Sequence, residues 1–240
     1  MTLNQIVVIL LIILMVWWPI GGLINRRRGQ AWLAWLQAGL KELGATSTIK
    51  WLRSFQSVGQ LTVKDLRSPF RSFDVLFTLE SRDNILLWVL RHMRGRRDEM
   101  IIQANLLANP VQELEVGYRG RRSYDVYLAK QKDNPFSQLP EQDGFRIAKR
   151  GGEDQGSIAR LRMFLANQGQ VIQRMSLQRS ELQENQRSLF PRESKNLLLR
   201  ADMTRMDAQS PAAFFSSLRQ WAGSVAVESD EGVDGSPKNT

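Results

Sequence analysis

The strongest hydrophobic pattern in the chain lies at its beginning. Nineteen residues from Ile6 to Ile24 follow one another without a charged side chain. At about 1.5 Å per residue, a helix of that length spans about 28 Å, close to the ~30 Å hydrocarbon core of a bilayer. This pattern predicts a transmembrane helix over residues 6–25, preceded by a short non-cytoplasmic N-terminus, residues 1–5.

The end of this apolar run has the composition of a membrane boundary. Trp17 and Trp18 lie near its C-terminal end, where indole rings favour the interface between lipid and water. Pro19 and the glycine pair 21–22 follow directly, and they predict that the helix kinks or ends there. We therefore expect the two tryptophans to contact headgroups.

Three consecutive arginines, Arg26, Arg27 and Arg28, predict the orientation of the segment. Under the positive-inside rule they remain on the cytoplasmic side, with the N-terminus outside or in a lumen. A cleaved signal peptide is the alternative interpretation. The long apolar run and the uncharged side chains before it favour a retained anchor. The sequence thus predicts a single-pass membrane protein, in the endoplasmic reticulum if the cell is eukaryotic.

Residues 26–227 alternate between helical and extended periodicity. The patterns predict helices over residues 29–44, 81–99, 121–133, 157–169 and 210–225, and strands over 57–66, 73–80, 99–107, 112–118, 170–178 and 194–204. Adjacent strands that pair as hairpins, separated by single helices, are typical of an α+β domain with a mainly antiparallel sheet and several packed helices. We expect this domain to be cytosolic.

Three of these elements carry more specific expectations. The helix over 81–99 has Ser81 as a candidate N-cap, and its apolar residues 85–90 lie on nearly every side, which predicts burial against the sheet. The strands over 99–107 and 112–118 are expected to pair with each other. The last helix has Ser210 as its predicted N-cap and Pro211 at its first position, and Gly44 is the expected C-cap of the helix over 29–44.

Composition adds a charge and removes several kinds of chemistry. The 240 residues carry a formal net charge of +9, which favours anionic partners, and residues 228–240 form an acidic tail that we expect to be disordered. There is no cysteine, so disulfides and thiolate catalysis are excluded. The lone His92 has no partner at a telling spacing. We therefore expect no catalytic, metal or cofactor site, no enzyme activity and no small-molecule substrate.

Arginine clusters are the remaining candidates for binding. The planar fork of arginine suits phosphate groups, although solvent-exposed basic surfaces without a ligand have the same composition. A third basic run covers residues 146–150. The candidate contacts for an anionic partner are Arg91, Arg94, Arg96 and Arg97, and then Arg119, Arg121 and Arg122.

The order of these pieces resembles a known family. A transmembrane helix, a basic junction with "QAW", "ESRDNILLWVLRHMR", "DEMIIQANL", "GYRGRRSYDVYLAKQ" and "SKNLLLRADM" follow one another. This order is similar to calumin, a coiled-coil-domain protein of the endoplasmic reticulum membrane and a subunit of the PAT complex. The match to that family's helix motif falls on Arg82, Asp83, Ile85, Leu86, Leu90 and Met93.

The resemblance is distant, and it covers a shortened chain. Calumin has a long acidic lumenal segment and a C-terminal coiled coil, whereas this chain has neither, so calcium binding through lumenal acids is not implied. What the resemblance implies is a non-enzymatic, membrane-anchored accessory factor that assists membrane-protein insertion or folding beside a translocon or ribosome. The alternative is a membrane-surface domain whose basic clusters bind anionic lipid headgroups.

Overall fold

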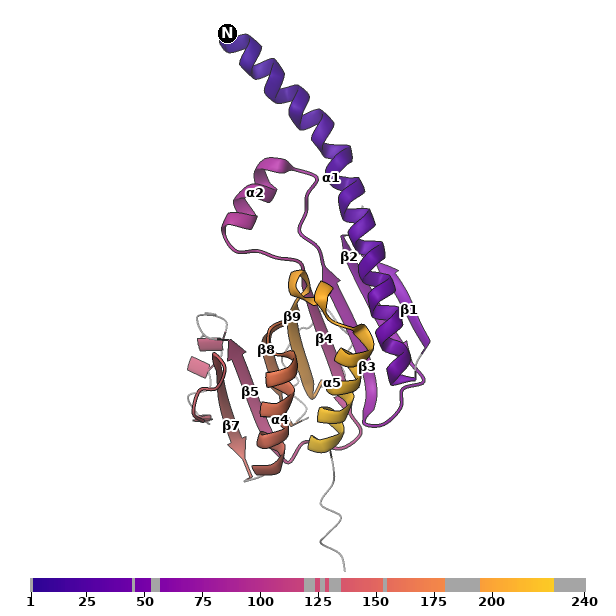
Figure 1. Ribbon diagram of the computed structural model, residues 1–240, viewed down its shortest axis with the longest axis vertical. Coiled ribbons are helices and arrows are strands. Elements are labelled where there is room, and N and C mark those ends of the chain that lie inside the picture. Colours follow the sequence, from indigo (N-terminus) through magenta and orange to yellow (C-terminus); the bar gives the residue numbers. More distant parts are fainter. Residues whose placement is uncertain are drawn as a thin grey trace, which may run out of the picture.

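The computed structural model describes residues 2–44, 46–52, 57–118, 124–125, 128–129, 135–152, 155–179 and 195–226. Most of the helix predicted over 121–133 and the whole tail over 228–240 lie outside these residues, so both stay predictions. The described elements form one antiparallel sheet with helices on one of its faces, and a long N-terminal helix that extends far beyond the sheet (Figure 1).

That N-terminal helix, α1, runs without interruption from Leu3 to Leu40 and contains Pro19. The prediction that the helix ends near Pro19 and that a second helix starts at residue 29 is therefore wrong. A proline removes one backbone donor, and the aliphatic, tryptophan and arginine side chains around it all tolerate helical backbone. After a short 3₁₀ turn, η1 (Lys41–Leu43), Gly44 ends the element with φ of 73°, in its predicted C-cap role.

The strands of the described part form one sheet in the order β1-β2-β3-β4-β9-β8-β5-β7-β6, and every pairing is antiparallel. This arrangement confirms the predicted α+β class. The strands are β1 (Thr46–Trp51), β2 (Val58–Lys64), β3 (Phe70–Thr78), β4 (Glu99–Leu106), β5 (Gln112–Tyr118), β6 (Ser137–Gln138), β7 (Phe145–Gly151), β8 (Ile172–Leu177) and β9 (Leu197–Asp202).

The expected pairing of the strands over 99–107 and 112–118 is wrong. β4 pairs with β3 and β9, whereas β5 pairs with β7 and β8. β9 is inserted beside β4 because its alternating Leu197 and Leu199 are fully buried and continue the apolar rows of the sheet. The short connection after β4 therefore leads to β5, which is not its neighbour in the sheet, and does not form a hairpin.

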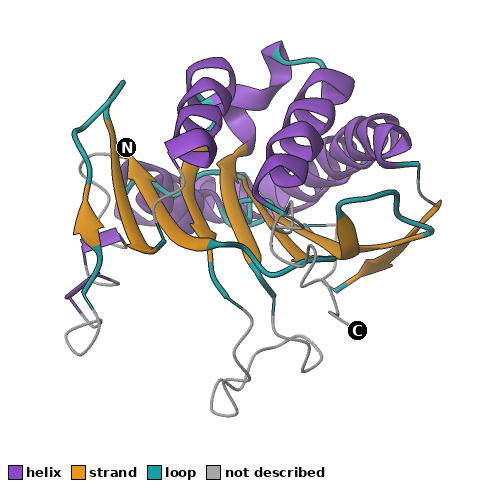
Figure 2. Ribbon diagram, turned by 90° about the horizontal axis from the view of Figure 1, so that it is seen from below, coloured by secondary structure: helices purple, strands orange, loops and turns teal. Residues whose placement is uncertain are grey.

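Three helices cover one face of the sheet: the C-terminal half of α1, α4 (Gln155–Gln168) and α5 (Pro211–Val225) (Figure 2). α5 begins as predicted, with Ser210 as N-cap and Pro211 at the first position. Phe215 of α5 is fully buried and packs on Trp35 of α1 and Phe73 of β3, with ring centroids 5.8 and 6.2 Å away. The domain core thus includes the same helix that carries the predicted membrane segment.

The helix predicted over 81–99 is shorter and is placed differently from the expectation. α2 spans Ile85–Met93, and its N-cap is Asn84, whose side chain accepts a hydrogen bond from the Leu87 amide at 3.1 Å. Ser81 instead donates to Asp83. None of the α2 side chains is buried, so the predicted packing against the sheet is wrong. α2 stands apart from the sheet, beside the extended part of α1 (Figure 1).

Candidate functional site

The connection between β3 and β4, residues 79–98, leaves the sheet and docks on α1. Gly21 of α1 makes this approach feasible, because a Cβ atom at that position would collide with the Arg82 carbonyl group. The same carbonyl accepts a hydrogen bond from Trp17 Nε1 at 2.7 Å. The Trp17 and Trp88 rings stack with centroids 6.1 Å apart. The Trp17 and Gly21 positions, expected to mark a helix end, thus form a docking surface for residues 79–98.

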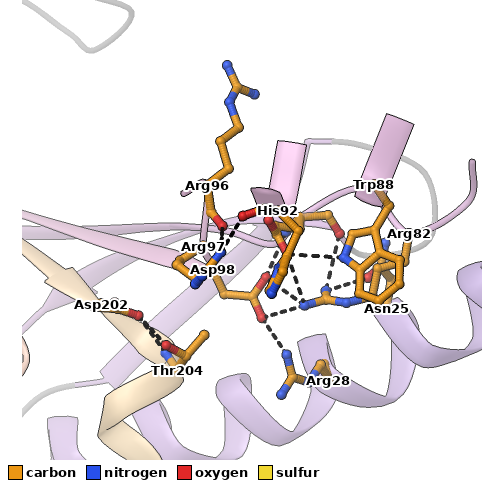
Figure 3. A network of polar contacts seen from close by, with 11 residues as sticks. Asn25, Arg28, Arg82, Trp88, His92, Arg96, Arg97, Asp98, Asp202 and Thr204 are labelled. Atoms are coloured by element: carbon orange, nitrogen blue, oxygen red, sulfur yellow. Dashed lines mark hydrogen bonds and ion pairs between the residues drawn. The ribbon is translucent and has the colours of Figure 1, made fainter. Parts of the chain in front are cut away.

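A buried ion pair holds this connection in place. Arg82 Nη2 donates to both carboxylate oxygens of Asp98 at 3.1 Å, and Arg82 Nη1 donates to Asn25 Oδ1 at 2.9 Å (Figure 3). Asp98 also accepts from the Glu80 amide at 2.8 Å and from Arg28 Nη1 at 2.7 Å. Because Asp98 is 1% exposed and Arg82 7%, removing either partner would leave the other charge buried.

Glu80 forms a second layer between this ion pair and α2. Its Oε2 atom accepts from Trp88 Nε1 at 3.1 Å and lies 3.2 Å from His92 Nδ1 and 3.7 Å from Arg82 Nη2. Its Oε1 atom is buried, and it has no hydrogen-bond partner among the described residues. The lone histidine is therefore part of a structural network that holds α2.

Two cations lie at the edge of this network, around a cavity of about 410 Å³. Arg28 keeps 41% of its side chain exposed although it pairs with Asp98. Arg97 is half-buried, and its Nη1 donates to the His92 and Arg96 carbonyl groups at 2.9 and 2.6 Å. The cavity is lined by Trp17, Ile24, Arg28, Glu80, Arg82, Trp88, His92, Arg97 and Thr204. Two arginine groups that are far apart in the sequence thus share one cavity.

α2 presents large apolar side chains outward, next to this cavity. Exposure reaches 66% for Leu86 and 80% for Met93. The other exposed large side chains of the helix are Leu87, Val89 and Leu90. A nine-residue helix with an apolar surface of this kind is unusual outside interaction sites. The same helix end carries Arg91 and His92 in its last turn and Arg94 as its C-cap, which complements the helix dipole.

The remaining predicted contacts divide into exposed and undescribed residues. Trp18, Arg26 and Arg27 on α1 are exposed, as are Arg94 and Arg96 after α2, while Arg91 is half-buried. Arg119, Arg121 and Arg122 lie outside the described residues. Of the predicted arginines that the structure describes, Arg28 and Arg97 line the cavity. The arginine triplet, attributed to topology alone, therefore also contributes a structural ion pair through Arg28.

The basic run over 146–150 lies in a strand. It forms most of β7, where Arg146 pairs with Asp125 and Arg150 pairs with Glu113. On neighbouring β5, burial raises the pKa of the Glu115 carboxyl, although a hydrogen bond and ion pair with Arg174 at 2.5 Å act in the opposite direction. These pairs form a charged ladder on the face of the sheet away from the helices.

A buried tyrosine accompanies this ladder. Tyr124 packs its ring over Gly117, where a Cβ atom would collide with it, and Arg146 lies over the same ring, 4.9 Å from the centroid. Burial raises the pKa of Tyr124 to about 12. Among the described residues no group of three or more histidine and acidic side chains is placed to hold a metal ion. The cavity beside α1 therefore offers more candidate ligand contacts than the charged ladder and Tyr124 do.

The sequence pattern did not identify the polar residues that form the buried network at the deep end of the cavity: Asn25, Glu80, Arg82 and Asp98. Each is a polar residue inside or next to an apolar segment, which is the one signal the sequence offers. That signal does not say which acid meets which base, because the partners come from three separate segments. No family model and no curated protein matches this chain.

Proposed function

We propose that this chain is a single-pass membrane protein whose α+β domain is held against the bilayer surface by two contacts. α1 crosses the membrane, and α2 lies in the interface beside it, with arginines facing anionic headgroups. The observation that carries the proposal is the exposed apolar surface of α2, fixed next to the apolar part of α1 by the Trp17–Trp88 stack. The proposed orientation places the domain in the cytosol, following the arginine triplet.

The continuity of α1 supports a retained anchor. α1 is long and apolar enough to cross a membrane, and only 12% of its most apolar window is buried against the domain. Further along the same helix, Trp32, Leu36 and Leu40 are almost fully buried in the core. Cleavage after the apolar run would remove Trp17 and Gly21, which hold residues 79–98. A cleaved signal peptide would not be expected to carry such contacts.

The position and composition of α2 support an interfacial helix. Trp17 belongs to the predicted boundary of the membrane segment, so its partner Trp88 lies at the same level. A short helix there exposes apolar side chains to water unless lipid covers them, and burial of each large side chain contributes roughly 1.5–3 kcal/mol. Arg94, Arg96 and Arg97 follow the helix directly, as in helices that bind anionic membrane surfaces.

The depth of α2 can be measured because the chain has no cysteine. We predict that a nitroxide label on Met93→Cys, in the full chain reconstituted in phosphatidylcholine–phosphatidylglycerol nanodiscs, contacts lipid. Its accessibility to oxygen should exceed that to a water-soluble nickel chelate. The matched control is Met163→Cys on α4, since Met163 is also a strongly exposed methionine, at 66% against 80% for Met93.

The control label should report water, because α4 lies on the sheet, toward the end of the domain away from α2 (Figure 1). A Met93 label with the same water-like accessibility as the Met163 label would refute the interfacial position of α2. Placing the label on an exposed residue leaves the packing of the domain intact in both variants.

A membrane-anchored accessory factor remains a second proposal. The observation that favours it is the charged ladder of β5, β7 and β8, which lies on the face of the sheet opposite α1, α4 and α5. A protein with such a face next to the bilayer has a surface for a partner such as an insertion complex or a ribosome. We predict that the chain and such a partner co-purify from mild detergent extracts. Recovery of the chain with neither an insertion complex nor a ribosome would contradict this proposal.

A further inference from the structure

We infer that the cavity between α1 and α2 is a binding site for the phosphodiester of one membrane phospholipid. The inference rests on the proposed membrane position of α2, and it names the ligand of that surface. The phosphate would lie between Arg28 and Arg97, and the glycerol and the first part of the acyl chains would lie against Trp17, Ile24 and Trp88.

The lining of the cavity changes from apolar to cationic in the direction in which α1 leaves the membrane. Along α1 the lining residues come in the order Trp17, Ile24 and Arg28, which covers about 16 Å of helix. A phospholipid has the complementary order, from its apolar chains to its anionic phosphate. A water-soluble phosphate compound has no apolar group that could contact the tryptophans at the other end of the cavity.

The charges at the deep end leave the two outer arginines available to an anion. Arg82 is held by Asp98 and Glu80, and Arg28 shares Asp98 with it. Three guanidinium groups, those of Arg28, Arg82 and Arg97, therefore face two carboxylates, which leaves an excess of one positive charge. In the described part of the chain no carboxylate pairs with Arg97, and its hydrogen bonds go to backbone carbonyl groups.

The size of the cavity fits a headgroup and not a whole lipid. Its volume of about 410 Å³ lies in the range of small-ligand sites, which is about 300–1,000 Å³. The acyl chains would continue along the exposed apolar surfaces of α1 and α2, which begin at the tryptophan end. Thr204, exposed at the same cavity, lines it from outside the two helices and donates its hydroxyl to Asp202 Oδ1 at 2.5 Å.

Native mass spectrometry of the full chain, released from detergent with added phosphatidylglycerol, tests the site. The variant Arg28→Gln with Arg97→Gln should bind the first lipid at least about tenfold more weakly, because it loses both charged donors. Its matched control is Lys50→Gln with Arg71→Gln, which removes the same charge from two exposed residues of β1 and β3 outside the cavity. The control should bind the first lipid as the unmodified chain does.

Two further ligands identify the source of the phosphate. Diacylglycerol with the same chains should bind much more weakly than phosphatidylglycerol, since it lacks the phosphodiester. Glycerol 3-phosphate should give no stable adduct, since it lacks the chains. Equal loss in both double variants, or equal binding of diacylglycerol, would overturn the site, and a glycerol 3-phosphate adduct as strong as the lipid adduct would overturn a lipid ligand.

Folding and membrane position are controlled separately. Arg97→Gln alone leaves every ion pair of Asp98 intact and should already weaken lipid binding several-fold; unchanged binding in this variant would also overturn the site. The label on Met93→Cys, measured in nanodiscs, reports whether α2 lies in lipid. A label in lipid combined with equal lipid binding by the two double variants would refute the cavity site alone, whereas a label in water would refute the membrane position on which it rests.

Discussion

Replacing Asp98 by alanine should detach residues 79–98 from α1. Asp98 accepts hydrogen bonds from Arg82, Arg28 and the Glu80 amide, and it is buried. Its removal leaves the Arg82 guanidinium in a low-dielectric site without its main partner, and breaking a buried ion pair from one side costs about 3–5 kcal/mol. We expect the amides of residues 79–98 to exchange hydrogen much faster by mass spectrometry, while those of β3 and β4 change little.

A second substitution distinguishes an isolated buried charge from lost packing. In Asp98→Ala combined with Arg82→Met, neither charge remains in the site, and we expect at least half of the lost protection to return. Losses that simply add would contradict the assignment of Arg82–Asp98 as the pair that holds the connection. Gly21→Val is expected to detach the same residues through the Arg82 backbone, without a change in charge.

Replacing Phe215 by alanine should destabilise the whole domain. Phe215 is fully buried, and its ring packs on Trp35, Phe73 and Phe214, while Gly39 lets α1 approach it closely. Loss of this ring leaves a cavity between α1, α5 and β3, for which we expect a loss of about 3–5 kcal/mol in the free energy of unfolding. Denaturant titration followed by tryptophan fluorescence measures it in the full chain in detergent.

The control for this change is Met163→Ala on α4. Met163 is 66% exposed, so its truncation removes little packing, and we expect a change below about 0.5 kcal/mol. Similar small losses in both variants would show that α5 does not anchor the domain on α1. Because α1 also carries the predicted membrane segment, this interface couples the stability of the domain to its anchor.

α2 shows why an apolar helix cannot be placed from its sequence alone. Its residues 85–90 are apolar on nearly every side, which predicted a helix correctly and burial against the sheet wrongly. The hydrophobic effect is non-directional, so the same apolar side chain is stabilised by burial either in a protein core or in a bilayer. The polar connection around α2 holds it off the sheet, because Arg82 and Asp98 form hydrogen bonds with Asn25 and Arg28 of α1.

Features that depend on neighbours along the chain could be predicted from the sequence pattern. The apolar run of α1, the alternation of most strands, the α+β class, the Gly44 cap and the Ser210–Pro211 helix start all rest on local periodicity and backbone preference. Three features became visible only in the folded chain: the continuity of α1 through Pro19, the insertion of β9 beside β4, and the position of Arg28 and Arg97 at one cavity. These depend on which distant polar groups pair and which apolar rows align, and one chain's local pattern leaves several such pairings equally acceptable.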